Sequence, residues 1–145
     1  MKAFKDIRLP HYNYSLNGWY FVTICTHSRL PLLSGRTGDE ISHFINSIPA
    51  TETGLSIDYF VVMPNHVHLI LVLENTPLKL GEIIRRFKAR TSRHFNRRLW
   101  QPNYYEHVIR DENALTKIRE YITNNPDAEK FAFEQFYKTE KAPHK

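Results

Sequence analysis

Two histidines stand two residues apart at the start of an apolar run, in the segment Met63–Leu73. Residues i and i+2 of a β-strand point to the same face, so a strand here would place His66 and His68 side by side. Neutral imidazoles bind divalent metal ions, usually together with a third ligand. Two interpretations are open at this point: part of a metal site, or two hydrated polar side chains at a strand end.

A competing interpretation is the His-x-His-x-His triad of nucleotide hydrolases. The third position of that triad is occupied here by Ile70. The triad therefore lacks one of its histidines, and the pair needs partners from elsewhere in the chain.

A helix near the end of the chain offers such partners, because Tyr121 and Asn125 are four residues apart and stack on one helical face. A tyrosine hydroxyl, whose usual pKa is about 10, becomes a nucleophile when a base, a cation or a metal-polarised target assists it. Asn125 offers a neutral oxygen ligand. The alternative is a structural role, with Tyr121 at the rim of an amphipathic helix and Asn125 as its C-cap.

A strongly basic segment precedes this helix, with seven cations and no acid between Arg85 and Arg98. Four arginines recur at helical spacing and form one stripe: Arg86, Arg90, Arg93 and Arg97. Guanidinium rows match phosphate oxygens and position a nucleic-acid backbone without reading its sequence. A solvated helix face is the alternative, although such faces usually mix both signs of charge.

Aromatic residues are concentrated just after the basic segment, from Trp100 to His107. Exposed rings such as Trp100 and Tyr105 would stack on unpaired bases. A cluster at the edge of the hydrophobic core explains the same composition equally well. Glu106 and His107 are additional candidates for the active site.

The elements that would position these residues follow the order β-α-β-β-α-β-α. This order predicts an α+β fold with a ferredoxin-like (RRM-like) antiparallel sheet, plus a C-terminal helix that carries the tyrosine. The third strand would turn Val67, Leu69 and Leu71 to a helix-covered core and leave the histidines on an open face. The expected strands are Trp19–Thr26, Leu55–Val62, His66–Leu73 and Tyr104–Ile109; the expected helices are Glu40–Ile48 with Asp39 as its cap, Pro77–Arg98, and one that Asp111 or Asn113 caps and that ends near Asn124.

The 145 residues predict one domain over 1–145, with a core of about 15–128 and a loosely held tail at 129–145. Cys25 is the one cysteine, so no internal disulfide can form. No segment is apolar enough for a signal peptide or a membrane span, which favours a cytoplasmic protein without a membrane partner. The net charge of +5 favours a polyanionic partner.

Three blocks of residues, in this order, resemble the single-tyrosine HUH transposases, and the REP-associated tyrosine transposases are the most similar branch. The resemblance covers the chain from about Tyr20 to Pro126. Its blocks are Tyr59–His68, then Trp100–Pro102 with Tyr105–Arg110, then Tyr121–Ile122 with Asn125–Pro126.

The resemblance implies DNA transposition by a metal-dependent endonuclease and strand transferase that acts on single-stranded DNA with hairpin ends. Tyr121 would form a 5′-phosphotyrosine intermediate, and His66, His68 and Asn125 would hold Mg²⁺ or Mn²⁺. The arginine stripe would grip phosphates on either side of the cleaved bond. Both a monomer and a homodimer are compatible with the sequence. The residues expected to contact DNA are Arg85, Arg86, Lys88, Arg90, Arg93, Arg97, Trp100, Tyr105 and Arg110.

A second hypothesis is a non-catalytic module that binds single-stranded nucleic acid on an RRM-like sheet. It predicts binding without a metal ion and no covalent adduct.

Overall fold

The computed structural model describes residues 17–127; the expectation for the tail at 129–145 lies outside them. Within this range the chain forms one antiparallel sheet in the order β2-β3-β1-β4, with helices between its strands. No helix of this part of the chain is long and apolar enough to cross a membrane. The elements are β1 (Asn17–Cys25), η2 (His27–Arg29), α1 (Arg36–Asn46), η3 (Ile48–Thr51), β2 (Leu55–Met63), β3 (His66–Glu74), α2 (Leu80–Phe95), β4 (Tyr105–Val108) and α3 (Glu112–Asn124).

The strand order confirms the ferredoxin-like prediction. The two central strands, β1 and β3, are almost continuously apolar, and nearly all of their residues are buried. A strand with this composition must be covered on both faces. The edge strands β2 and β4 are only partly buried, as expected for strands with one neighbour.

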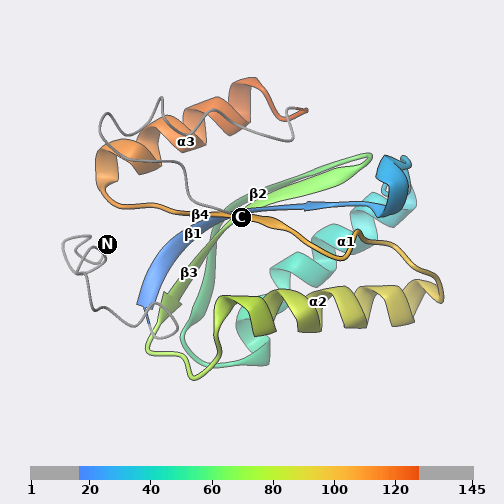
Figure 1. Ribbon diagram of the computed structural model, residues 1–145, viewed down its shortest axis with the longest axis horizontal. Helices are drawn as coiled ribbons and strands as arrows, with labels where there is room; N and C mark the ends of the chain where they lie inside the picture. Colours follow the sequence, from blue (N-terminus) through green and yellow to red (C-terminus); the bar gives the residue numbers. More distant parts are fainter. Residues whose placement is uncertain (1–16, 128–145) are drawn as a thin grey trace.

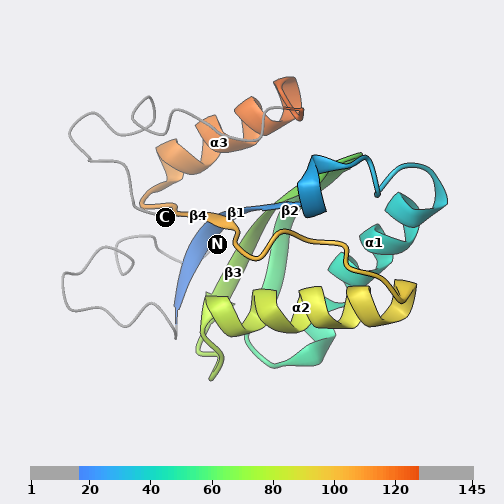
Figure 2. The ribbon, with the colours of Figure 1, turned by 45° about the vertical axis from the view of Figure 1, so that its right-hand side comes forward.

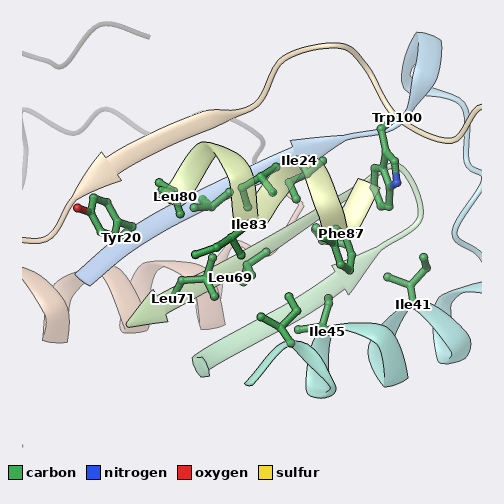
Figure 3. Close-up of a cluster of buried hydrophobic side chains, with 14 of the residues drawn as sticks. Tyr20, Ile24, Ile41, Ile45, Leu69, Leu71, Leu80, Ile83, Phe87 and Trp100 are labelled. Atoms are coloured by element: carbon green, nitrogen blue, oxygen red, sulfur yellow. The ribbon is translucent and has the colours of Figure 1, made fainter. Parts of the chain in front are cut away.

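Helices α1 and α2 cover one face of the sheet (Figures 1 and 2). Their apolar side chains pack on alternate residues of the central strands, among them Leu69 and Leu71. Figure 3 shows this core, in which Ile41 and Ile45 of α1 and Phe87 of α2 lie on the same face of the sheet. The predicted assignment of these β3 residues to the helix-covered core is confirmed.

Helix α3 covers the opposite face, so the prediction of an open face is wrong (Figure 2). Leu115, Ile118 and Ile122 form its apolar stripe and pack against Ile70 and Val72 of β3. Burial of both apolar surfaces stabilises this arrangement more than leaving either one in water. The sheet is therefore sandwiched between two layers of helix.

Several boundaries differ from those predicted. Helix α1 begins at Arg36 and not after Asp39, which lies in its first turn and donates its N–H to the carbonyl of Gly35. Helix α2 begins at Leu80, three residues after Pro77, and ends before Asn96, whose left-handed φ of 52° stops the helix. The predicted cap by Asp111 is confirmed, because its side chain accepts a hydrogen bond from the Ala114 amide.

A β-bulge interrupts strand β2 at Asp58, between the pairs Ile57↔Leu71 and Tyr59↔Ile70. The extra residue moves Tyr59 to the α3 face although Ile57 packs on the α1–α2 face. The Asp58 carboxylate receives two hydrogen bonds from Arg119 of α3, at 2.9 and 2.5 Å. The bulge thus supplies an ionic tie between the edge of the sheet and the helix that carries Tyr121.

Candidate active site

The two histidines are the first and third residues of strand β3 and lie on the face of the sheet that α3 covers. Their ring centroids are 4.6 Å apart. The prediction that they lie side by side is confirmed. Their side chains are buried, with exposed fractions of 1% for His66 and 0% for His68, so they are not the hydrated strand-end residues of the alternative interpretation.

The orientation of His68 is set by its neighbours on strand β1. Its Nδ1 lies 2.8 Å from the hydroxyl of Thr23, the residue directly opposite on β1. The ring of Phe21 lies at 5.4 Å on the same strand. A hydrogen bond to one imidazole nitrogen fixes the orientation of the ring, as in metal-ligating histidines.

His66 is held from both sides. Its Nδ1 lies 2.7 Å from the side-chain oxygen of Asn65, and its Nε2 lies 2.9 Å from the main-chain carbonyl of Pro126. A carbonyl oxygen only accepts, so Nε2 carries a hydrogen and donates a hydrogen bond to Pro126; the neutral ring then accepts at Nδ1 when the Asn65 amide presents its nitrogen. His66 can therefore ligate a metal only after one of these two contacts is released.

The contact with Pro126 also brings the end of α3 to the histidines. Asn125 immediately precedes Pro126, and its main-chain N–H donates to the carbonyl of Tyr121 at 2.8 Å. Tyr121 is half-buried and packs at the margin of the α3 cluster, whereas Asn125 is exposed. The Asn125 amide nitrogen lies 3.4 Å from the same Tyr121 carbonyl, so the side chain folds back on its own helix.

These residues fit a divalent ion by their chemistry. Within residues 17–127, no group of three or more His, Cys, Asp or Glu side chains is arranged to hold a metal. Asn125 directly precedes Pro126, whose carbonyl contacts His66, so the Asn125 amide is the candidate for a third ligand. Two imidazoles, one amide oxygen and water suit Mn²⁺ and accommodate Mg²⁺.

Three arginines of the predicted stripe, Arg86, Arg90 and Arg93, lie on α2, on the other side of the sheet from the histidines, whereas Arg97 follows the end of this helix (Figure 1). The expectation that the stripe grips phosphates on both sides of the cleaved bond stays a prediction, and this position on the far face of the sheet favours a more distant contact. Glu82 also binds Arg85 and Arg86 at its first turn, with nitrogen–oxygen distances of 2.6 and 2.7 Å. Hydrogen bonds from Arg85 and Arg86 lower the pKa of Glu82 to about 2.

Two residues expected to contact DNA have structural roles. Trp100 is 4% exposed, packs on Phe87 and donates its indole N–H to Thr91 at 2.8 Å, so it belongs to the core (Figure 3). The Lys88 ammonium donates to three successive carbonyls at 2.8, 3.2 and 3.0 Å, those of residues 101, 102 and 103. Burial lowers the pKa of Lys88, and its charge is used inside the protein.

Strand β4 places Tyr105 opposite Thr23, the residue that contacts His68. Tyr105 therefore lies on the histidine face, two strand spacings of about 4.8 Å from His68. His107 lies deeper on the same face, opposite Phe21, and is 1% exposed. Burial, and then the charge of Arg110, lower the pKa of His107 to about 4. His107 is therefore neutral at pH 7 and lies buried on the face of the sheet that α3 covers.

Two features of the site were missed at the level of sequence. The Asp58–Arg119 tie depends on a bulge that alternation of apolar residues does not reveal. A cavity of about 550 Å³ opens where the chain leaves the sheet before β4, and its lining includes Cys25, the partner of His66 on β1. Its lining includes the aromatic and amide residues that follow Trp100, and that composition was the signal available in the sequence.

Comparison with known proteins places this geometry in a family. Residues 14–125 match the model of the family described as "Transposase IS200 like". The chain belongs to this transposase family. The predicted enzyme class, a transposase, is thereby confirmed.

Individual members of the IS200-like transposases support the assignment. The ISDra2 transposase TnpA of Deinococcus radiodurans is 28% identical over 123 residues, which cover 76% of this chain and 85% of that protein. A Haemophilus influenzae protein named a REP-associated tyrosine transposase is 24% identical over 135 residues, covering 79% of this chain and 73% of that protein. The solved structure of a REP-associated tyrosine transposase bound to a REP hairpin has the same fold, with a TM-score of 0.68, 24% identity, and coverage of 82% and 73%.

Proposed function

We propose that this transposase cleaves and rejoins single-stranded DNA next to hairpins, with Tyr121 as its nucleophile. The observation that carries the proposal is the 2.9 Å contact between His66 Nε2 and the Pro126 carbonyl. This contact joins the end of the tyrosine helix to the histidine pair, although about sixty residues separate them in the chain. Two of the three blocks, which are distant in the sequence, thus meet at the start of β3.

The proposed reaction is a transesterification between the Tyr121 phenol and a phosphodiester of the DNA. The Tyr121 oxygen attacks the phosphorus, its proton leaves, and the bond from phosphorus to the 3′ oxygen breaks. The departing 3′ oxygen takes up a proton, and the 5′ phosphate remains on the tyrosine. Because the new ester retains the energy of the old one, a 3′-hydroxyl of another strand can reverse the step and join DNA without ATP.

His66, His68 and Asn125 would hold the divalent ion, Mg²⁺ or Mn²⁺. When bound, such an ion neutralises charge on the non-bridging phosphate oxygens. The protein contributes the orientation of His68 through Thr23 and a buried setting for both imidazoles. The Asn125 amide nitrogen contacts the carbonyl of Tyr121, so the amide oxygen is the atom that would coordinate the ion.

The arginines of α2 serve a different part of the DNA. They lie about two packing layers from the histidines, which corresponds to roughly 20 Å. Successive phosphates of one strand are far closer together than this, so the stripe holds a segment several nucleotides from the cleaved bond. A hairpin stem, which presents closely spaced phosphates, fits a row of guanidinium groups. The relative solved with a REP hairpin supports this choice of ligand.

The hypothesis of a non-catalytic RRM-like module needs an exposed sheet face on which bases can stack. In the structure, α1 and α2 cover one face and α3 covers the other. The observation that would favour this second function is absent from residues 17–127.

The test is a labelled hairpin oligonucleotide with a single-stranded flank, incubated with the full chain and Mg²⁺ or Mn²⁺. Wild type should give a cleaved strand and a DNA–protein adduct that survives denaturation, and EDTA should abolish both. His66→Ala should lose the metal-dependent reaction. His43→Ala, on the exposed side of α1, is the matched control and should retain it. Equal cleavage with and without EDTA would contradict the metal assignment.

A further inference from the structure

A cavity of about 550 Å³ lies beside the histidine pair, at the start of strand β4. One of its walls is Cys25, the residue directly opposite His66 on the neighbouring strand. Another wall is Tyr105, which is opposite Thr23 on the histidine face. The cavity therefore opens next to the place where the proposed function puts the cleaved phosphate.

The cavity exists because the chain leaves the sheet there. From Tyr20 to Thr23, each pair of opposed residues on β1 and β4 follows one regular register. Continued regularly, this register would set Thr26 opposite Pro102, but its partner is Trp100. Two extra residues are thus accommodated between Trp100 and Tyr105, and this segment bows away from β1.

The bowed segment is fixed at both ends and in the middle. The Gln101 amide donates to the carbonyl of Cys25 at 2.9 Å, and the Trp100 indole is anchored to Thr91. The Lys88 ammonium gathers three successive carbonyls, from Gln101 to Asn103, and lies 5.8 Å from the centre of the Tyr104 ring. A loop that is ordered in advance loses little conformational entropy when a ligand binds.

The lining of the cavity indicates what it would bind. It contains two amide side chains, two tyrosines, a proline and a carboxylate, and it contains no lysine or arginine: Cys25, Gln101, Pro102, Asn103, Tyr104, Tyr105 and Glu106. An anionic phosphate would meet the Glu106 carboxylate, and the nearby Lys88 ammonium is already bound by three main-chain carbonyls. A neutral base finds aromatic surface for stacking and amides that pair with the donors and acceptors of its edge. The volume lies within the range of small-ligand sites, about 300–1,000 Å³.

We propose that this cavity binds one unpaired nucleobase of the DNA strand beside the cleaved phosphate. The inference rests on the proposed function for its location. The base enters from the edge of the sheet, stacks on a tyrosine and is read by Gln101 and Asn103. Lys88 is a positioning residue, since it holds the loop and does not touch the base. The transposase would thus recognise one base of its target directly.

The experiment measures affinity in Tyr121→Phe, which cannot cleave, for hairpin oligonucleotides in which one flank nucleotide at a time is abasic. One position should weaken binding about 10-fold, in line with a stacked base. Adding Gln101→Ala and Asn103→Ala should reduce this penalty to about 3-fold at that position and leave the other positions unchanged. Adding Asn46→Ala, an exposed amide at the end of α1, should leave the 10-fold penalty intact.

The proposal is overturned if no flank position shows a penalty, or if the penalty is the same with and without the cavity substitutions. Thermal unfolding of each variant verifies that the loop substitutions leave the fold intact. Failure of the proposed function has a separate signature, which is the absence of a covalent adduct with wild type. The affinity series decides about the cavity in either case, because it does not require cleavage.

Discussion

The Nε2 atom of His66 donates a hydrogen bond to the carbonyl of Pro126 at 2.9 Å, which ties the first residue of β3 to the end of the tyrosine helix. Pro126 follows Asn125, the proposed third metal ligand. The same nitrogen cannot donate to a carbonyl and coordinate a metal. Coordination through Nε2 would therefore couple metal binding to a local movement at the end of α3.

This coupling predicts a change in the protonation of His66 when metal binds. In metal-free protein, imidazole NMR spectra should show a protonated Nε2 on His66. At Mg²⁺ concentrations that support cleavage, that signal should change to the type of a coordinated nitrogen, and the amide signals at the end of α3 should shift with it. A protonated Nε2 that persists in the cleavage-competent protein would contradict His66 ligation through this atom.

Thr23→Val should weaken metal binding without removing a ligand. The substitution deletes the hydroxyl that orients His68, and loss of such a partner typically costs 10- to 100-fold in metal affinity. The Mn²⁺ concentration needed for half-maximal cleavage should rise at least about 10-fold. Thr116→Val on the exposed side of α3 is the matched control and should leave the Mn²⁺ requirement unchanged. An unchanged requirement in Thr23→Val would show that His68 is not a ligand.

The Asp58–Arg119 tie should matter more for the reaction than for DNA affinity. Arg119→Met leaves the mostly buried Asp58 carboxylate without this partner. It also removes an anchor of α3 that lies two residues before Tyr121. We expect a loss of about 1–2 kcal/mol in the free energy of unfolding, since Arg119 is partly exposed. Adduct formation should slow severalfold while hairpin affinity stays near wild type. Arg98→Met removes an exposed arginine and is the control. If Arg119→Met lowered hairpin affinity as much as the rate of adduct formation, that result would argue against a positioning role for Arg119.

Arg93 and Lys88 should respond in opposite ways to substitution, although both belong to the same basic helix. Arg93→Gln should reduce the slope of log affinity against log salt by about 1, because one phosphate contact is lost. Lys88→Met should leave that slope unchanged and destabilise the protein by about 2–3 kcal/mol, because three carbonyls lose a charged donor. Salt titrations of hairpin binding and chemical unfolding measure the two effects. A salt slope that falls with Lys88→Met would restore Lys88 as a DNA contact.

Acid should destabilise the protein through His107. Its folded-state pKa is about 4, below the usual 6.5, so between these values the unfolded chain binds a proton that the folded protein does not. Stability is therefore complete above pH 6.5 and falls as the pH is lowered toward 4, by on the order of 2–3 kcal/mol. His107→Gln should flatten this part of the profile relative to wild type. Parallel profiles for the two proteins would show that His107 is not the responsible group.

Sequence patterns predicted the fold well because they report local rules. The alternation in β3 correctly assigned Leu69 and Leu71 to one face, and Asp111 was correctly chosen as a cap. The cover over His66 and His68 was missed, since alternation shows which residues share a face but not what packs on it. The apolar stripe of α3 and the apolar residues Ile70 and Val72 were both visible, but their pairing is a tertiary contact.

The roles of charged and aromatic residues were less predictable for the same reason. Trp100 and Tyr105 are equivalent as aromatic residues in the sequence, yet one lies in the core and the other on the histidine face. Lys88 and Arg93 are both cations of the basic segment. The sequence does not show that the Lys88 side chain turns toward the carbonyls of residues 101–103. The bulge at Asp58 and the bowed segment before β4 both depend on pairing between strands, which composition does not encode.

The central claim is tested most directly by locating the covalent bond between protein and DNA. Wild type should be incubated with the hairpin oligonucleotide and Mn²⁺, digested, and analysed by mass spectrometry. We predict a nucleotide 5′-phosphate on the peptide containing Tyr121, no adduct with Tyr121→Phe, and a normal adduct with Tyr59→Phe, which removes a hydroxyl that contacts α3. An adduct on any other residue, or one that persists in Tyr121→Phe, would contradict the account.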